Sequence, residues 1–169
     1  MNSKFIFCVL VSALFSGCSS FGSQEHVRYD SPQPINASEA DIVSSEIFKE
    51  VFNNNASAFQ KNVSSFCLST GTSTSLQDPS TALILLFAGH TPKITPASEC
   101  SNKSGGVVDK SGKRAISFNV SDLKKNTDGS YNAQAGYYEG NLSSQTNTYN
   151  AKKVDGKWVV NLVEMGPVS

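Results

Sequence analysis

The sequence has no excess of charge of either sign. Its 169 residues include 14 Lys and Arg against 14 Asp and Glu, and charged residues make up only 17% of the chain. A nucleic-acid-binding surface needs a basic patch, and a protein held at a membrane by electrostatics needs a cluster of Lys and Arg. The balanced composition argues against both. We therefore expect no nucleic-acid partner and no polybasic membrane contact.

The chain is also poor in motifs that carry out chemistry. Only two histidines occur, His26 and His90, and there is no CxxC spacing and no GxSxG, HExxH or paired-carboxylate motif. Gly105-Gly106 and Gly112-Lys113 do not make a phosphate-binding loop, because the four-residue spacer and the Ser or Thr after the lysine are absent. These absences lead us to expect no cofactor, no metal and a protein that is not an enzyme.

A long hydrophobic run is missing as well, and the one short run lies at the N-terminus. Lys4 precedes 11 mostly apolar residues, from Phe5 to Phe15, and small residues follow them. This is the layout of a secretory signal peptide. The run is shorter than the roughly 20 apolar residues that a membrane-spanning helix needs.

The end of this run, Leu14-Phe15-Ser16-Gly17-Cys18, resembles the lipobox of bacterial lipoproteins, with Phe15 where a leucine is usual. The resemblance implies that residues 1–17 are removed as a signal peptide. It also implies that the Cys18 thiol carries a diacylglycerol and that the new amino group carries a fatty acyl chain such as palmitate. Lipid of this kind would anchor the protein stably without help from charge. An ordinary signal peptide cleaved nearby is the alternative.

Ser19 follows Cys18, at the position where aspartate resembles an inner-membrane retention signal of enterobacterial lipoproteins. The resemblance therefore implies attachment at the periplasmic face of the outer membrane. Residues 18–37 contain Ser, Gly, Gln and Pro with few aliphatic residues, which is typical of a flexible tether. We expect a single domain over residues 38–169, because the remaining length suits one hydrophobic core.

Four cysteines are present, and two of them remain for the folded part. Cys8 lies in the signal peptide and Cys18 would be lipidated, which leaves Cys67 and Cys100 in an oxidising compartment. An even pair in such a compartment predicts a disulfide. Two free buried thiols or one functional thiol are the alternatives.

The folded part begins with a helical pattern. Ser38 suits an N-cap, and acidic residues follow it in the first turn. A short strand is expected within residues 62–70, a loop over 69–78, and a second, buried helix that Asp78 caps and Gly89 ends. Residues 91–106 are expected to be irregular. The apolar stripe of the first helix, over residues 38–52, consists of Ile42, Val43, Ile47, Phe48, Val51 and Phe52.

From Val107 onward the hydrophobic period changes from 3.6 to 2, which is typical of strands. The alternation predicts an antiparallel meander of three long strands and a shorter one near residues 105–109. Asp128-Gly129 and Asp155-Gly156 predict tight hairpin turns, in which both central residues have positive φ. Trp158 alternates in step with Val160 and Leu162, which places the three on one face of the strand, so we expect Trp158 to face the N-terminal helix.

The order helix, strand, helix, meander predicts an α+β fold, with both helices packed on a curled antiparallel sheet. This order resembles the cystatin-like and NTF2-like group, in which a long helix lies across a bent antiparallel sheet. Short motifs also resemble a widespread family of uncharacterised bacterial proteins, from which no activity can be carried over. These motifs are Phe66-Cys67-Leu68, Phe87-Ala88-Gly89-His90, Ser98-Glu99-Cys100, Gly136-Tyr137-Tyr138-Glu139-Gly140, Asn147-Thr148-Tyr149 and Gly156-Lys157-Trp158.

Three residues are candidates for ligand binding. Tyr137 and Glu139 share one face of a strand, and the NTF2-like resemblance implies a cavity there; alternatively, Tyr137 fills a half-buried strand and Glu139 begins a turn. His90 is the only histidine of the expected domain. We expect it to bond carbonyl groups at the end of the preceding helix, with a catalytic or binding role as the alternative. Residues 109–114 are expected to form a turn with its charges in solvent.

The sequence thus favours a lipid-anchored, non-enzymatic lipoprotein that binds an envelope protein partner or a ligand in the periplasm. One alternative is an inhibitor of a periplasmic or cell-wall enzyme, which would use the loop Thr70–Asp78 as a wedge. Another is an enzyme with an NTF2-like pocket, which would use His90, Tyr137 or Glu139. An exposed apolar loop tip would favour the inhibitor, and a pocket that holds two of those three residues would favour the enzyme.

Cys18 is expected to be the site of lipid attachment. Substitution Cys18→Ala removes the thiol that would be alkylated, so it should abolish labelling by a fatty-acid analogue and block lipoprotein-type processing. Metabolic labelling followed by gel electrophoresis checks this, with Cys8→Ala as the matched control that keeps its label. Unchanged labelling of Cys18→Ala would contradict the lipobox assignment.

Overall fold

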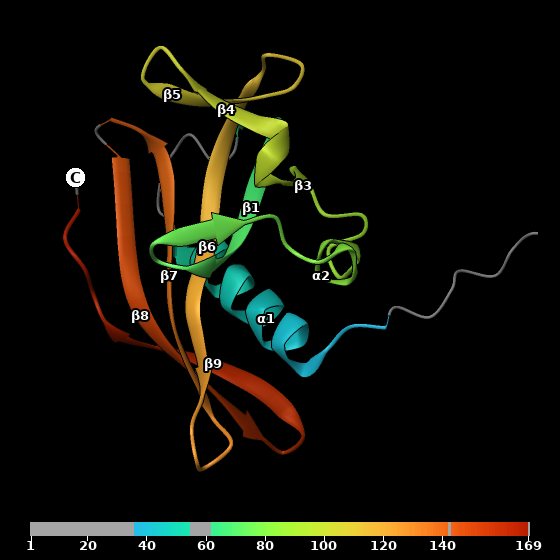
Figure 1. Ribbon diagram of the computed structural model, residues 1–169, viewed down its shortest axis with the longest axis vertical. Helices are drawn as coiled ribbons and strands as arrows, with labels where there is room; N and C mark the ends of the chain where they lie inside the picture. Colours follow the sequence, from blue (N-terminus) through green and yellow to red (C-terminus); the bar gives the residue numbers. More distant parts are fainter. Residues whose placement is uncertain (1–35, 55–61, 142, 169) are drawn as a thin grey trace, which may run out of the picture. The chain divides into compact units, whose positions relative to one another are not determined.

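The computed structural model describes residues 36–54, 62–141 and 143–168, and Figure 1 shows their arrangement. The predicted signal peptide, the predicted lipidation site at Cys18 and nearly all of the predicted tether lie outside these ranges. Within the ranges, no helix has both the length and the apolar character needed to cross a membrane.

In the described part of the chain, two α-helices pack against a strongly curled sheet, so the α+β class is confirmed (Figure 1). The strands follow the order β2-β1-β6-β5-β7-β8-β9, with β3 beside β1 and β4 beside β5. The elements are α1 (Glu39–Asn54), β1 (Ser65–Thr72), β2 (Ser75–Gln77), α2 (Thr81–Leu85), β3 (Lys93–Pro96), the 3-10 helix η2 (Ala97–Glu99), β4 (Cys100–Lys103), β5 (Gly106–Asp109), β6 (Arg114–Lys125), β7 (Tyr131–Gly140), β8 (Ser143–Val154) and β9 (Lys157–Glu164).

Helix α1 begins where the sequence predicts. Ser38 Oγ accepts a hydrogen bond from the Asp41 N–H at 3.1 Å, and the Asp41 carboxylate accepts one from the Ser38 N–H at 2.9 Å. This reciprocal capping satisfies donors that a helix start otherwise leaves without partners. Burial raises the pKa of Asp41, but hydrogen bonds from Ser38 and Ser80 outweigh it and hold that pKa below its ordinary value. The bond from Ser80, at 2.7 Å, also joins α1 to the start of α2.

The apolar stripe of α1 fills the inside of the curled sheet. Phe48 is fully buried, whereas Ile42, at the margin of the stripe, is 38% exposed. Phe52 lies among rings of the sheet, with its centroid 4.7 Å from that of Phe118 on β6 and 4.9 Å from that of Phe66 on β1. Each such ring buries a large apolar area, so this contact between helix and sheet is the main hydrophobic core.

The prediction of a wholly antiparallel sheet is wrong, because β1 runs parallel to both β3 and β6. Phe66 lies opposite Ile94 on one side and Ile116 on the other, so the sheet is mixed. A parallel pair needs a long connection between its strands. The residues between β1 and β6 provide one, since they include α2 and four short strands.

The predicted meander is present, with four long strands (β6, β7, β8 and β9) rather than three. Asp155 and Gly156 both have positive φ, as the hairpin turn requires, and this prediction is confirmed. At the other predicted turn only Gly129 has positive φ, and the loop is longer, closed by the Asn126 N–H donating to the Ser130 carbonyl at 2.8 Å. The segments 69–78 and 91–106, predicted as loop and irregular, contain short strands whose pairing with β1 and β5 stabilises them.

The second helix, α2, is shorter than predicted and is capped by Ser80 instead of Asp78. Ser80 Oγ accepts from the Leu83 N–H at 3.0 Å, while the Asp78 carboxylate accepts from the Ser98 N–H at 2.8 Å. Only part of the helix is covered, since Leu83 is buried and Leu85 is 46% exposed.

Cys67 on β1 and Cys100 at the start of β4 form the predicted disulfide. Cys67, Val107 and Ala115 make a second apolar cluster, against which Cys100 and Tyr138 pack. Because side chains alternate along a strand and the neighbours of Cys67 belong to the main core, this cluster lies on the sheet face opposite α1. The bonded residues are 33 positions apart, and a closed loop of that length stabilises the fold by about 3.8 kcal/mol on the chain-entropy estimate.

Trp158 packs against the main core as predicted, but it is only half-buried, and its ring meets that of Tyr131 edge-on at 5.6 Å. We expect Trp158→Ala to lower the free energy of unfolding by about 2–3 kcal/mol, less than the roughly 3–5 kcal/mol typical of a fully buried ring. Urea denaturation measures this. The control Val159→Ala, on the other face of β9, should change it by less than about 0.5 kcal/mol. If Trp158→Ala lowers the free energy of unfolding as little as Val159→Ala does, Trp158 lies on the surface.

Candidate functional site

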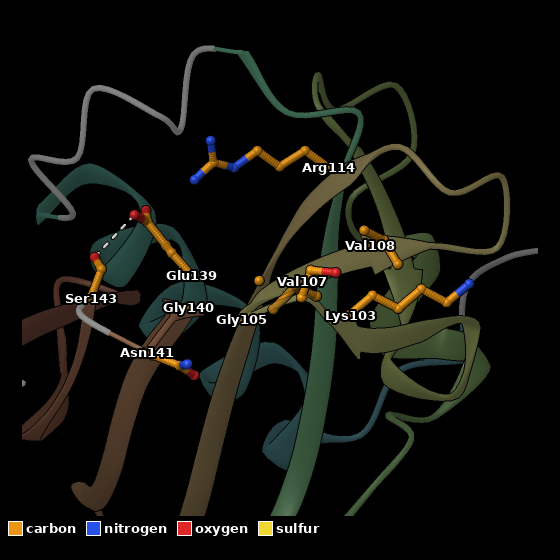
Figure 2. A pocket seen from close by; sticks show the side chains of 11 residues that line it. Lys103, Gly105, Val107, Val108, Arg114, Glu139, Gly140, Asn141 and Ser143 are labelled. Carbon is orange, nitrogen blue, oxygen red and sulfur yellow. Dashed lines mark hydrogen bonds between the residues drawn. The ribbon is translucent and has the colours of Figure 1, made fainter.

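An open hollow of about 570 Å³ lies where the β4–β5 hairpin meets the end of β7 and the start of β8 (Figure 2). Its lining combines two cationic side chains, a buried carboxylate and glycine-rich backbone. The lining residues are Lys103, Ser104, Gly105, Gly106, Val107, Val108, Arg114, Glu139, Gly140, Asn141 and Ser143.

The hairpin that forms one wall turns at Ser104 and Gly105, whose φ angles are +50° and +79°. A two-residue turn of this kind matches the twist of the flanking strands and favours glycine. The turn carries Lys103 and Gly106 to the edge of the hollow. Ser-Gly is a turn signal in the sequence, although we predicted irregular structure here.

Glycines also let two backbone segments approach closely beside the hollow. Gly106 on β5 pairs with Gly140 on β7, and the Asn141 N–H donates to the Gly105 carbonyl at 3.1 Å. A Cβ atom on Gly140 would overlap the Gly105 carbonyl group. Glycine at position 140 is therefore required for the hairpin to reach β7.

Glu139 is the buried charged group of the hollow, with only 3% of its surface exposed. The pairing of β7 with β8 shifts between Tyr138 and Gly140, and a bulge of this kind changes the direction of a side chain. The Ser143 hydroxyl donates to Glu139 Oε2 at 3.0 Å. Burial of a carboxylate costs free energy unless hydrogen-bond donors or cations surround it. The fold supplies such a donor at this place in the Ser143 hydroxyl.

Arg114, the first residue of β6, supplies a cation to the same hollow. It pairs with Val108 on β5, which places it beside the hairpin. Figure 2 shows its guanidinium extending over the hollow on the side where the Glu139 carboxylate lies. An acidic and a basic group therefore face one volume, which can accept a ligand with complementary groups.

The structure separates the three residues that the sequence singled out. Glu139 lines the hollow, but Tyr137 packs against the main core as a half-buried side chain and is not among the lining residues. His90 is not among the lining residues either, and its ring lies beside Phe52, Phe66 and Phe87. One of the three therefore reaches the site.

His90 is part of the aromatic packing that holds α2. Its ring centroid is 5.5 Å from that of Phe52 and 5.6 Å from that of Phe66. Its Nδ1 lies 2.7 Å from the Pro92 carbonyl, and its main-chain N–H donates to the Phe87 carbonyl. The ring thus bonds a carbonyl beyond the helix, whereas we predicted a carbonyl of the helix itself.

Sequence reasoning missed Arg114, Lys103 and Ser143. We predicted that the charges of residues 109–114 lie in a solvent-exposed turn, and Arg114 instead begins β6 and lines the hollow. No local pattern marks it, because its distance to Glu139 is set by the pairing of β5 with β6 and with β7.

A smaller hollow of about 200 Å³ next to the same hairpin contains Asp109, Glu99 and Lys110. Asp109 accepts hydrogen bonds from the hydroxyls of Ser64, at 2.6 Å, and Ser111, at 2.7 Å, and these hold its pKa well below the ordinary value. Glu99 lies 3.2 Å from Lys110. These polar contacts hold two loops together, and across the described ranges no group of three or more His, Cys, Asp or Glu side chains could hold a metal ion.

No protein-family model matches the chain, and no curated protein and no solved structure is significantly similar to it.

His90 is expected to have a structural role. Substitution His90→Gln removes ring contacts and one hydrogen bond, so it should lower the free energy of unfolding by about 1 kcal/mol. Complementation of a deletion strain at matched protein levels should be unaffected, because His90 is not among the residues that line the hollow. A His90→Gln protein that is folded and abundant yet fails as completely as the deletion would contradict this role and favour the pocket enzyme.

Proposed function

We propose that this protein is a lipid-anchored, non-enzymatic lipoprotein of the bacterial envelope, whose α+β domain binds a small polar ligand in the hollow beside the β4–β5 hairpin. The observation that carries the proposal is Glu139, a carboxylate almost fully buried at an open hollow that Arg114 also lines. A fold that only needed stability would gain little from a buried charge at this place.

The chemistry of the lining supports one class of ligand. A guanidinium binds carboxylate and phosphate groups with two parallel hydrogen bonds, and a carboxylate accepts from N–H and ammonium donors. A ligand that carries both an anionic group and an N–H donor, such as an amino acid or a short peptide, has groups complementary to Arg114 and to Glu139. The volume of about 570 Å³ lies within the usual range of small-molecule sites.

The location of the protein in the cell is part of the proposal. The lipobox-like segment that ends at Cys18, and Ser19 after it, support attachment at the periplasmic face of the outer membrane. The long helix α1 against a curled sheet supports a cystatin-like or NTF2-like arrangement. The parallel pairing of β1 with β6 departs from that arrangement.

Binding to the full-length lipoprotein in detergent tests the proposal, with isothermal titration calorimetry against a panel of amino acids and di- and tripeptides. We expect saturable binding of at least one member. Arg114→Gln and Glu139→Gln should each weaken it by about tenfold, which corresponds to about 1.4 kcal/mol. Lys113→Gln, which changes the adjacent cation outside the hollow, should leave the affinity unchanged. Equal affinities in all three variants, with unchanged circular dichroism, would contradict this site.

A second function, inhibition of a periplasmic or cell-wall enzyme, is favoured by the hairpin of β1 and β2. This hairpin occupies the segment Thr70–Asp78 that we predicted as a wedge, and its Leu76 is 48% exposed. The Asp122 carboxylate accepts from the Ser73 N–H at 3.2 Å and holds the hairpin on β6. If inhibition is the function, Leu76→Asp should abolish crosslinking to an envelope enzyme, while variants of the hollow should retain it.

A further inference from the structure

We propose that the chain forms a symmetric dimer in which β9 pairs antiparallel with β9 of a second copy. Among the described strands, β9 is hydrogen-bonded only to β8, and it ends the strand order of the sheet. The side of β9 away from β8, called here the β9 edge, runs over Lys157–Glu164. None of these residues lines the hollow, so the inference does not depend on the proposed ligand site.

The β9 edge is long, and its middle carries neither a charge nor a proline. Natural proteins keep an exposed sheet edge from pairing by making it very short or by placing charges or proline on it. The strand at the other end of the order, β2, has only three residues. β9 has eight residues, and those between the first and the last, Trp158–Val163, are uncharged and include no proline. Such an edge is suited to the addition of a further strand, whose main-chain groups pair with it.

Exposed apolar side chains gather on β9 and beside it. Of the nine large apolar side chains that are exposed in the described part of the chain, six lie within residues 154–168. Leu162 lies opposite Tyr149, which is only 1% exposed in the main core, yet Leu162 itself is 43% exposed. The core face of the sheet therefore continues to an apolar side chain that the rest of the described chain leaves in solvent. Concentrated exposure of this kind marks an interaction surface.

The side chains of β9 divide between the two faces of the sheet. Val160 and Leu162 lie opposite core residues of β8, and Trp158 alternates in step with them, so these three share the face that packs against α1. Lys157 and Glu164 both project from the other face, because a bulge just before Glu164 shifts the alternation by one residue. β9 therefore has an apolar row on one face and, on the other, a cation at one end and an anion at the opposite end.

One antiparallel register suits both faces. With Val160 opposite Val160 of the second copy, Trp158 of each copy lies opposite Leu162 of the other, so the apolar row continues from one sheet into the next. The bulge then places Lys157 of each copy opposite Glu164 of the other, which gives two cross-strand pairs of opposite charge. Parallel pairing would instead set Lys157 beside Lys157 and Glu164 beside Glu164. Charge complementarity therefore selects a second copy of this chain in antiparallel orientation.

Sedimentation equilibrium of the full-length lipoprotein in density-matched detergent tests the inference. We expect a dimer and no larger species, because each copy uses its single β9 edge. Leu162→Lys should raise the dimer dissociation constant by about tenfold, since the interface would bury an added charge. The fold of one chain should survive this change, because Leu162 is already exposed there. Leu85→Lys on α2, where the leucine is 46% exposed, is the matched control and should leave the dimer unchanged.

Charge reversal tests the register. Lys157→Glu and Glu164→Lys should each raise the dissociation constant by about tenfold, because each variant sets like charges opposite one another at both ends of the joint. The double variant Lys157→Glu/Glu164→Lys restores opposite charges and should restore the dimer. Lys113→Glu makes the same change of charge in the exposed turn before β6 and should leave the dissociation constant unchanged.

Crosslinking in cell envelopes locates the two-fold axis. Val160→Cys should give a disulfide-linked dimer under mild oxidation, because directly opposed residues of antiparallel strands have Cα atoms about 5 Å apart. Val163→Cys is the control on the same strand. Its two copies would stand about 20 Å apart in this register, so it should stay uncrosslinked.

Any of three results would overturn the inference. The first is a chain that stays monomeric up to about 0.1 mM, including the case in which another envelope protein binds the β9 edge of a monomer. The second is a dimer that Leu162→Lys and Leu85→Lys affect equally. The third is a double charge reversal that remains as weak as the single ones, or a Val163→Cys crosslink as fast as that of Val160→Cys. Arg114→Gln should leave the dimer unchanged, so failure of the hollow and failure of the β9 edge are distinguishable.

Discussion

The packing of Phe52 into the curl of the sheet is the contact on which the rest of the fold depends. Its ring lies within 6 Å of Phe66 on β1, of Phe87 beside α2 and of Phe118 on β6. One side chain therefore joins both helices to two strands that are far apart in the sequence. Offset and edge-on arrangements of this kind add to the free energy gained from burial alone. His90, which is half-buried, packs its ring against three phenylalanines of the same cluster.

The cluster around the Cys67–Cys100 disulfide joins strands on the other face of the sheet. Cys100 is bonded to Cys67 on β1, and the covalent link holds β4, which among the described strands pairs only with β5. The β4–β5 hairpin supplies one wall of the hollow. Stability and the proposed ligand site are therefore coupled, because the bond that restricts the unfolded chain also positions Lys103 and the turn at Gly105.

The proposed ligand site depends on charge. The hollow beside Glu139 and Arg114 concentrates opposite charges in a small volume, which suits a compact ligand with matching groups.

The sequence by itself determined what depends on local periodicity and on composition. The stripe of α1, the alternation of the meander strands, the turn at Asp155-Gly156 and the pairing of the two remaining cysteines are all decided by neighbours in the chain or by simple counting. The pattern of apolar and polar side chains shows which face of a strand is buried, but it does not show which strand lies beside it. The parallel position of β1 next to β6 was therefore decided by tertiary structure alone. So was the placement of Arg114 and Glu139 on one hollow, because the pairing of β5 with β6 and with β7 brings together residues that no local pattern connects.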